Sequence, residues 1–194
     1  MSSAATETIQ DAKPQRYKVT GDVHLVLRRG DTVLYGQRSN TGFEDGAWHL
    51  PAGHLEAGES VVTALVREAA EEIGVTIRPE DVQFSHFMHN SSSGGRMAIF
   101  FTVTDWHGEP ENCEPDKCSA LDWFALDTPP DRMIDYCRVA MKHIAEGTPF
   151  SVYGWQSYDA PVRPGGVHQL LGAGGVVECA PISVSEPRCG NSKC

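Results

Sequence analysis

The sequence contains no long apolar run and no apolar segment near its start. No stretch approaches the roughly 20 consecutive apolar residues that a membrane-spanning helix needs. The first residues, MSSAATETIQDAKPQRY, lack the apolar core of a secretory signal peptide. We therefore expect a cytoplasmic protein that does not associate with a membrane.

Basic residues are too few to form a surface that binds a nucleic-acid polymer. Lys and Arg number 16 against 26 Asp and Glu, which gives a formal net charge of −10. From Trp155 onward acids and bases cancel, so the negative excess belongs to residues 1–154. A protein this acidic that handles phosphates needs cations between itself and its substrate. The charge favours a metal-dependent enzyme acting on a small phosphorylated molecule.

The six cysteines include no Cys-x-x-Cys pair and no cluster with histidine at zinc-binding spacing. We interpret them as free thiols, most of them buried, because unpaired cysteine behaves as a small apolar side chain. A disulfide between Cys189 and Cys194 is the alternative that the spacing leaves open.

Composition divides the chain into three segments. Residues 1–16 are predicted to form a flexible N-terminal arm, and residues 17–155 a single domain. Residues 156–194 hold six Gly, four Pro and one aromatic residue, which predicts a disordered or loosely docked tail. Residues 167–171 and 176–177 are the parts of this tail apolar enough to dock on the domain.

Hydrophobic periodicity predicts five strands and two helices in the domain. The strands are expected at 17–29, 33–37, 82–88, 97–106 and 120–126, and loops at 39–54 and 90–95. The helices are expected at 60–73, with Ser60 as its cap and Gly74 as its end, and at 131–146. The order strands, helix, strands, helix predicts an α/β sandwich with a mixed sheet.

The first predicted helix carries three glutamates that share one side. Glu68 lies three residues before Glu71 and four before Glu72, so like charges gather at an unfavourable spacing. Arg67 alone cannot neutralise three carboxylates. Hard oxygen ligands in this number select Mg²⁺, with Mn²⁺ as a substitute, and these ions also bind phosphates. The Gly-rich loop that ends at this helix can add a backbone carbonyl to the metal site and amides for anionic oxygens.

A solvated helix face is the alternative for the fragment Arg-Glu-x-x-Glu-Glu taken alone. The complete segment from Gly53 to Val75, however, resembles the Nudix box, G-x5-E-x7-R-E-U-x-E-E-x-G-U, where U is a bulky aliphatic residue. All fixed letters are matched, by Gly53, Glu59, Arg67, Glu68, Glu71, Glu72 and Gly74. Ala69 is smaller than the pattern prefers, which affects packing under the helix and not the chemistry.

Weaker resemblance to MutT-like members of the family extends from about Tyr17 to Trp155. The stretch from Gly46 to Gly53 is similar to their W-x-L-P-G-G segment, with Ala52 in place of one glycine. The resemblance implies a Nudix-type α/β/α sandwich. It also implies a nucleoside triphosphate pyrophosphohydrolase, often acting on oxidised or modified nucleotides, that yields the monophosphate and pyrophosphate.

The resemblance also implies roles for the box residues. The metal ligands would be the Gly53 carbonyl with Glu68, Glu71 and Glu72, and Glu68 would also be a candidate general base. Arg67 would orient a glutamate, and Glu59 would brace the loop near the helix start. Glu114 or Asp116, downstream of the box, stays open as a base or additional ligand.

Substrate contacts are less constrained by the sequence. The candidates are an arginine and four aromatic or imidazole side chains: Arg38, Phe43, Trp48, His86 and Trp123. Packing in the core is an equal alternative for the four rings. Arg96 is either a phosphate contact or a surface residue.

Two other functions remain open at this stage. One is hydrolysis of a non-nucleotide diphosphate such as a prenyl diphosphate, and the other is a Nudix domain that senses a nucleotide without cleaving it. The retained glutamates argue against the second. We expect a monomer or a homodimer.

Overall fold

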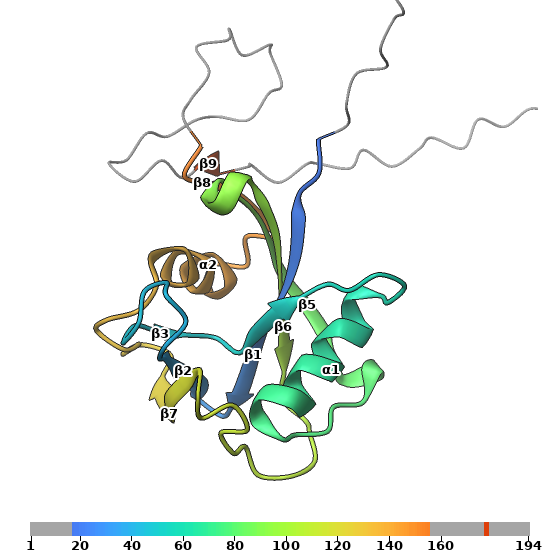
Figure 1. Ribbon diagram of the computed structural model, residues 1–194, viewed down its shortest axis with the longest axis vertical. Helices are drawn as coiled ribbons and strands as arrows, with labels where there is room; N and C mark the ends of the chain where they lie inside the picture. Colours follow the sequence, from blue (N-terminus) through green and yellow to red (C-terminus); the bar gives the residue numbers. More distant parts are fainter. Residues whose placement is uncertain (1–16, 156–176, 179–194) are drawn as a thin grey trace, which may run out of the picture.

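The computed structural model describes residues 17–155 and 177–178. A β-sheet lies between two helices, α1 (Val61–Ile73) and α2 (Asp135–Ala145), which cover its opposite faces (Figure 1). This arrangement confirms the predicted α/β/α sandwich. None of the helices in the described part of the chain is long and apolar enough to cross a membrane. The predicted arm at 1–16 and the predicted tail, apart from 177–178, lie outside the described residues.

The sheet is mixed, as predicted. Its strands in the described residues are β1 (Thr20–Arg29), β2 (Thr32–Arg38), β3 (Trp48–His49), β4 (Ala52–His54), β5 (Gln83–Asn90), β6 (Arg96–Val103), β7 (Cys118–Ala125), β8 (Phe150–Tyr153) and β9 (Val177–Glu178). They follow the order β3-β2-β1-β6-β5-β8-β9, with β4 paired to β1 and β7 to β2. The pairs β1–β6 and β5–β8 are parallel, and the other pairs are antiparallel.

Strand β1 separates two hydrophobic cores because its side chains alternate between the faces of the sheet. Val23, Leu25 and Leu27 pack beneath α1 with Leu65 and other helix residues. Val26 faces α2 instead, in the core that also contains Phe100, Met133 and Cys137. The sheet is therefore covered on both sides, and its central strands are almost wholly apolar.

Local signals set the two ends of α1. The Ser60 hydroxyl accepts a hydrogen bond from the Thr63 amide at 3.1 Å, and Gly74 adopts φ +69° where the helix stops. Beyond that point the loop after β6 caps the last turn: the amides of Glu111 and Cys113 donate to the carbonyls of Ile73 and Glu72, both at 3.0 Å. These bonds satisfy carbonyls that a helix end otherwise leaves open.

Removing the Ser60 cap is expected to weaken the fold without altering its chemistry. Ser60→Ala should lower the free energy of unfolding by about 1 kcal/mol, because the Thr63 amide loses its acceptor. Urea denaturation followed by circular dichroism measures this change. Thr104→Ala, at an exposed position outside α1 whose hydroxyl forms no hydrogen bond with the described residues, is a suitable control; equal losses in the two variants would contradict the capping role.

Several boundaries differ from the sequence prediction. Strand β1 begins at Thr20 and not at residue 17, and the ends of β2, β5 and β7 differ by one or two residues. Helix α2 begins at Asp135 and not at Asp131, because residues 132–134 run extended beside Trp48: the Trp48 amide donates to the Arg132 carbonyl at 2.7 Å, and the Ile134 amide donates to the Trp48 carbonyl at 3.0 Å. The predicted loop at 39–54 contains the short strands β3 and β4. Strand β6 ends at Val103, three residues before the predicted end.

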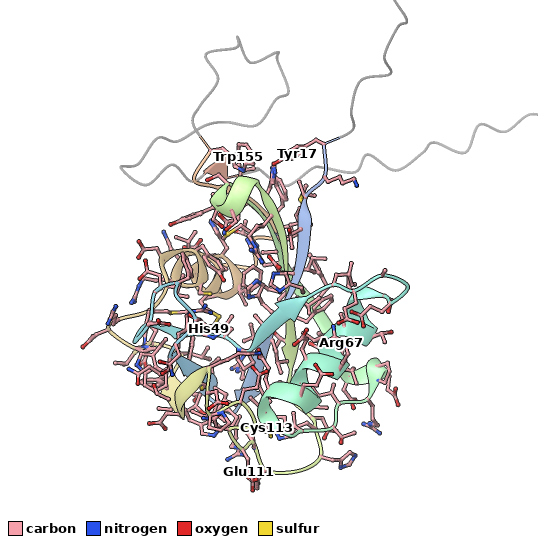
Figure 2. All side chains as sticks on the ribbon, viewed as in Figure 1. Tyr17, His49, Arg67, Glu111, Cys113 and Trp155 are labelled. Atoms are coloured by element: carbon pink, nitrogen blue, oxygen red, sulfur yellow. The ribbon has the colours of Figure 1, made fainter. Side chains whose placement is uncertain are left out.

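The remaining differences are additions to the predicted elements. Strand β8 was not predicted, and residues 177–178 of the tail pair with it, Val177 opposite Val152. Two 3-10 turns, η1 (Pro79–Asp81) and η2 (Ser92–Gly94), flank β5. The three cysteines in the described region are free thiols, as predicted. Tyr17 and Trp155, the ends of the continuous described segment, lie together beside β8 (Figure 2).

Candidate active site

The Gly53 backbone and the Glu68 carboxylate are in direct contact. Strand β4 carries Gly53 opposite Val23 of β1, and α1 lies over it with Glu68 facing the strand. A Cβ atom at residue 53 would stand 1.8 Å from the carboxyl carbon of Glu68. Only glycine therefore lets this carboxylate reach the backbone, which explains the fixed glycine at the start of the motif.

Arg67 connects three of the motif glutamates through one guanidinium group. Its Nε and Nη2 donate to the two oxygens of Glu59 at 3.2 and 2.8 Å, and Nη1 donates to Glu68 at 2.8 Å and to Glu71 at 3.1 Å. Nη2 also donates to the His54 carbonyl at 3.1 Å. These partners raise the pKa of Arg67, and Arg67 in turn lowers the pKa of Glu59. The predicted orienting and bracing contacts are thus present.

Glu72 is largely shielded from water. Its Oε2 accepts a hydrogen bond from the Ala52 amide at 2.9 Å. Its pKa is raised to about 8, mainly by burial and also by the negative charges of Glu68 and Glu114, against the lowering effect of that amide. A carboxyl group in this position keeps its proton at neutral pH until a cation replaces it.

The loop between β6 and β7 brings Glu114 and Lys117 to the same place. The Lys117 ammonium donates to a Glu114 oxygen at 2.6 Å, and this carboxylate raises the pKa of Lys117. Asp116, in contrast, is exposed, does not line the cavity at the box glutamates, and contributes only its carbonyl, which accepts from Asn40 at 3.1 Å. The geometry therefore favours Glu114 over Asp116 as the additional acidic residue.

These groups line one cavity of about 640 Å³ between α1, β4 and the loop before β7. Five carboxylates face it: Glu56, Glu68, Glu71, Glu72 and Glu114. The cations along its wall are Arg38, Arg67 and Lys117. Even with Glu72 protonated, four carboxylates face three cations, so the cavity as a whole is negatively charged at neutral pH.

The donor set fits a hard divalent cation. Carboxylate oxygens and the backbone at Gly53 are the ligands that Mg²⁺ and Mn²⁺ prefer, and the five carboxylates outnumber the Cys118 thiol and the imidazoles of His49 and His54 in the same wall. In the described part of the chain no three acidic, His or Cys side chains converge on a common point as they stand. The reason is visible in the contacts of Arg67, which holds Glu68 and Glu71. A cation entering the site has to draw these carboxylates from the guanidinium.

A smaller cavity of about 280 Å³ adjoins the first across Ala52, Gly53 and His54. Its wall is polar: Asp22 accepts two hydrogen bonds from Arg96, at 2.6 and 2.5 Å, and Arg96 also donates to His54 Nε2 at 3.0 Å. Arg96 is therefore committed to a carboxylate, which leaves its charge largely neutralised. Phe43, whose side chain is 52% exposed, forms part of the rim.

Two histidines in this second wall, the buried His24 and the half-buried His49, were missed by the sequence analysis. Burial lowers the pKa of His24 to about 3 and that of His49 to about 4, so both rings stay neutral. His24 stacks on Phe100 with 4.5 Å between ring centroids. The available signal was the presence of Asp22 and His24 at alternate positions of an otherwise apolar strand, since polar residues on a buried face have a reason to be there.

The predicted substrate contacts separate into two groups. Arg38 and Phe43 reach the cavities, with the Arg38 guanidinium held by the Phe43 carbonyl at 2.8 Å. Trp48, His86 and Trp123 do not line either cavity.

Each of those three rings has a packing role. Trp48 packs edge-on against Phe124 in the core under α2. His86 is fully buried, hydrogen-bonded to the Thr148 carbonyl and the Ser151 hydroxyl at 2.8 Å each. Trp123 lies on the α1 side beneath the Arg29 guanidinium at 4.4 Å. These three rings therefore pack in the core, which was the alternative to substrate contact in the sequence analysis.

Comparison with known proteins agrees with this geometry. The sequence pattern of the NUDIX domain matches residues 18–139. The crystal structure of a MutT NUDIX hydrolase from Burkholderia pseudomallei superposes with a TM-score of 0.60 and 26% identity, covering 65% of this chain and 98% of that one.

Two curated relatives match shorter stretches. The 8-oxo-dGTP diphosphatase of Proteus vulgaris is 29% identical over 85 residues, which are 44% of this chain and 75% of the relative. The human 8-oxo-dGDP phosphatase NUDT18 is 54% identical over 56 residues, 29% of this chain and 17% of that much longer protein. The motif, the sandwich and the NUDIX match over most of residues 17–155 agree, and the chain belongs to the Nudix family, with its likeness to the MutT-like hydrolases.

Proposed function

We propose that this protein is a divalent-metal-dependent hydrolase that cleaves the diphosphate linkage of a nucleoside triphosphate, releasing the monophosphate and pyrophosphate. The observation that carries the proposal is the cavity in which five carboxylates surround the Gly53–Glu68 contact. Such a cavity repels a polyphosphate unless a cation lies between them, and Mg²⁺, or Mn²⁺ in its place, would lower the charge of the phosphates and acidify a bound water.

The chain's own residues have distinct parts in this proposal. Glu68, Glu71, Glu72 and the Gly53 carbonyl hold the cation, and Arg67 keeps Glu68 and Glu71 oriented through the bonds described above. Glu59 fixes Arg67 from the other side. Glu68 is our candidate for the general base, because its carboxylate stands at the centre of the site, and Glu114 is the second candidate.

The second cavity supports a nucleotide and not a prenyl diphosphate. Its wall offers the neutral rings of His24 and His49 together with the Asp22–Arg96 pair. A prenyl chain placed there would cover these polar groups without offering them any further hydrogen bond, which is unfavourable. A nucleobase has edges that can hydrogen-bond with them and a face that can stack on Phe43. The names of the Proteus and human relatives extend the proposal to oxidised guanine nucleotides.

A product-release screen tests the proposal. The full chain is incubated with 8-oxo-dGTP, dGTP, 8-oxo-dGDP, NAD, a 5′-triphosphorylated RNA and geranyl diphosphate, each with Mg²⁺ and with excess chelator. We expect pyrophosphate from the triphosphates, detected as phosphate only after inorganic pyrophosphatase is added. Chelator should reduce the rate to background, since nothing else in the cavity offsets the repulsion. Turnover that persists in chelator, or preference for geranyl diphosphate, would contradict the proposal.

A further inference from the structure

A third cavity, of about 520 Å³, lies under α2 on the sheet face opposite α1. It shares no lining residue with the two cavities of the candidate active site. We call it the α2 cavity. Apolar side chains form most of its wall: Val26, Tyr35, Leu126, Met133, Met141 and Ile144. Val26 and Tyr35 are only 2% exposed, whereas Leu126 is 39% exposed, so the cavity runs from the core to the surface.

The size and lining of the α2 cavity match those of small-molecule sites. Such sites occupy roughly 300 to 1,000 Å³ and combine apolar walls with a few polar groups that fix orientation. The two methionines in the wall, Met133 and Met141, are flexible and adapt to ligands of irregular shape. An apolar ligand body is therefore the first property that the cavity selects.

The charges around the cavity are all positive, although the chain carries a net charge of −10. Arg28, Arg138 and Lys142 line it, and the described lining includes no Asp or Glu. Arg138 is held by backbone carbonyls, its Nη2 donating to Pro130 at 2.9 Å and to Asp131 at 2.8 Å, so its charge is not cancelled there.

Each of the other two cations forms one exposed ion pair with a carboxylate. Arg28 lies 3.7 Å from Asp31, and Lys142 lies 3.8 Å from Glu146; all four of these side chains are more than 40% exposed, so both pairs are weak. Three cations whose charges are at most weakly compensated favour an anionic group on the ligand.

Tyr35 supplies a further observation inside the cavity. Its ring contacts Phe124 edge-on, and its hydroxyl forms no hydrogen bond with the part of the chain that the structure describes. The hydroxyl oxygen is not enclosed by protein atoms, so it is open to the cavity that Tyr35 lines. A ligand oxygen in the cavity would accept the bond that the protein does not supply.

We propose that the α2 cavity binds a small amphiphilic anion, an aliphatic carboxylate of medium length. Its chain lies among Met133, Met141 and Ile144, and its carboxylate accepts from the Tyr35 hydroxyl and faces Arg138 and Lys142. The proposal does not depend on the proposed function, because the two sites share no residue.

Calorimetric titration of the full chain with octanoate tests this proposal. We expect saturable binding of octanoate, binding of hexanoate weaker by roughly fifteenfold, since each buried methylene contributes about fourfold, and no measurable binding of octylammonium. Equal binding of octanoate and octylammonium would overturn the charge argument and with it the proposal. Absence of octanoate binding would overturn it directly.

Three variants locate the binding in the α2 cavity. Ala145→Trp places a ring at an exposed lining position, where it should abolish binding without disturbing the core. Tyr35→Phe removes only the hydroxyl and should weaken octanoate about fivefold. Lys142→Glu should weaken it about fivefold as well, whereas Lys18→Glu, the same charge change at an exposed residue outside the cavity, should change affinity less than about twofold. Unaltered affinity in Ala145→Trp, or equal effects of the two lysine variants, would overturn the proposal.

Discussion

Gly53→Ala is expected to reduce turnover at saturating metal by about a hundredfold or more while the protein remains folded. The added Cβ would lie 1.8 Å from the Glu68 carboxyl carbon, so the carboxylate has to leave the backbone of β4. Displacement of a catalytic group by about 1 Å costs on the order of a hundredfold in rate. Steady-state kinetics over a range of Mg²⁺ concentrations, with the substrate found by the product-release screen, measures the effect.

Gly21→Ala is the matched control for this variant. Gly21 is a glycine of β1, and a Cβ there would be 3.6 Å from Leu55, an ordinary contact. Its turnover should stay within about twofold of the parent, as expected for a substitution without strain. If Gly53→Ala retained the parent rate, the close approach of Glu68 to the backbone would have no part in the reaction.

Glu72→Gln is expected to lower turnover by about a hundredfold or more and to weaken the metal dependence. Glutamine keeps an acceptor for the Ala52 amide but supplies no negative charge. In the parent protein, Glu72 has to lose a proton before it can hold a cation, and its pKa is about 8. The affinity for Mg²⁺ should therefore rise with pH through this region, and in Glu72→Gln this rise should be absent. Glu111→Gln, an exposed residue at the far end of the loop, is the control.

In the absence of metal, Glu72→Gln should stabilise the fold at high pH, although it lowers turnover. Because the folded-state pKa of Glu72 is above its ordinary value, the fold favours the protonated group. The associated stability is complete below about pH 4.5 and is lost as the pH rises through about 8. Glu72→Gln should therefore be more stable than the parent at pH 9 and similar at pH 4. Denaturant titration in the presence of chelator measures both stabilities. If the parent were the more stable protein at pH 9, Glu72 would be ionised in the fold and the prediction would be wrong.

The segment that carries the three glutamates was predictable because its signal is local. Helical spacing alone placed Glu68, Glu71 and Glu72 on one side, and Ser60 and Gly74 marked the ends of the helix. The proximity of Gly53 and Glu68 followed only from the resemblance to the motif, because the spacing of the two residues in the sequence does not show that they meet. The choice between Glu114 and Asp116 required the loop that caps α1, whose path depends on bonds to Ile73 and Glu72.

The rings were not predictable because their environment depends on strand register. A bulge between Phe84 and His86 shifts the pairing of β5, and His86 then lies buried beneath α2 and hydrogen-bonded to residues that follow that helix. A one-residue shift moves a strand side chain to the other face. The cavity at Asp22 and His24 was missed for a related reason, since it is built from β1, β4 and α2, which are far apart in the sequence.

The five hydrogen bonds of Arg67 have a consequence for how the protein comes to be assembled. One internal cation holds Glu59, Glu68 and Glu71 together through hydrogen bonds, although it neutralises only one of their three charges. Zinc fingers differ, because their chains stay unfolded until the ion arrives. In this protein the guanidinium would keep the box residues together before a divalent cation binds, and binding would then change only the local partners of Glu68 and Glu71.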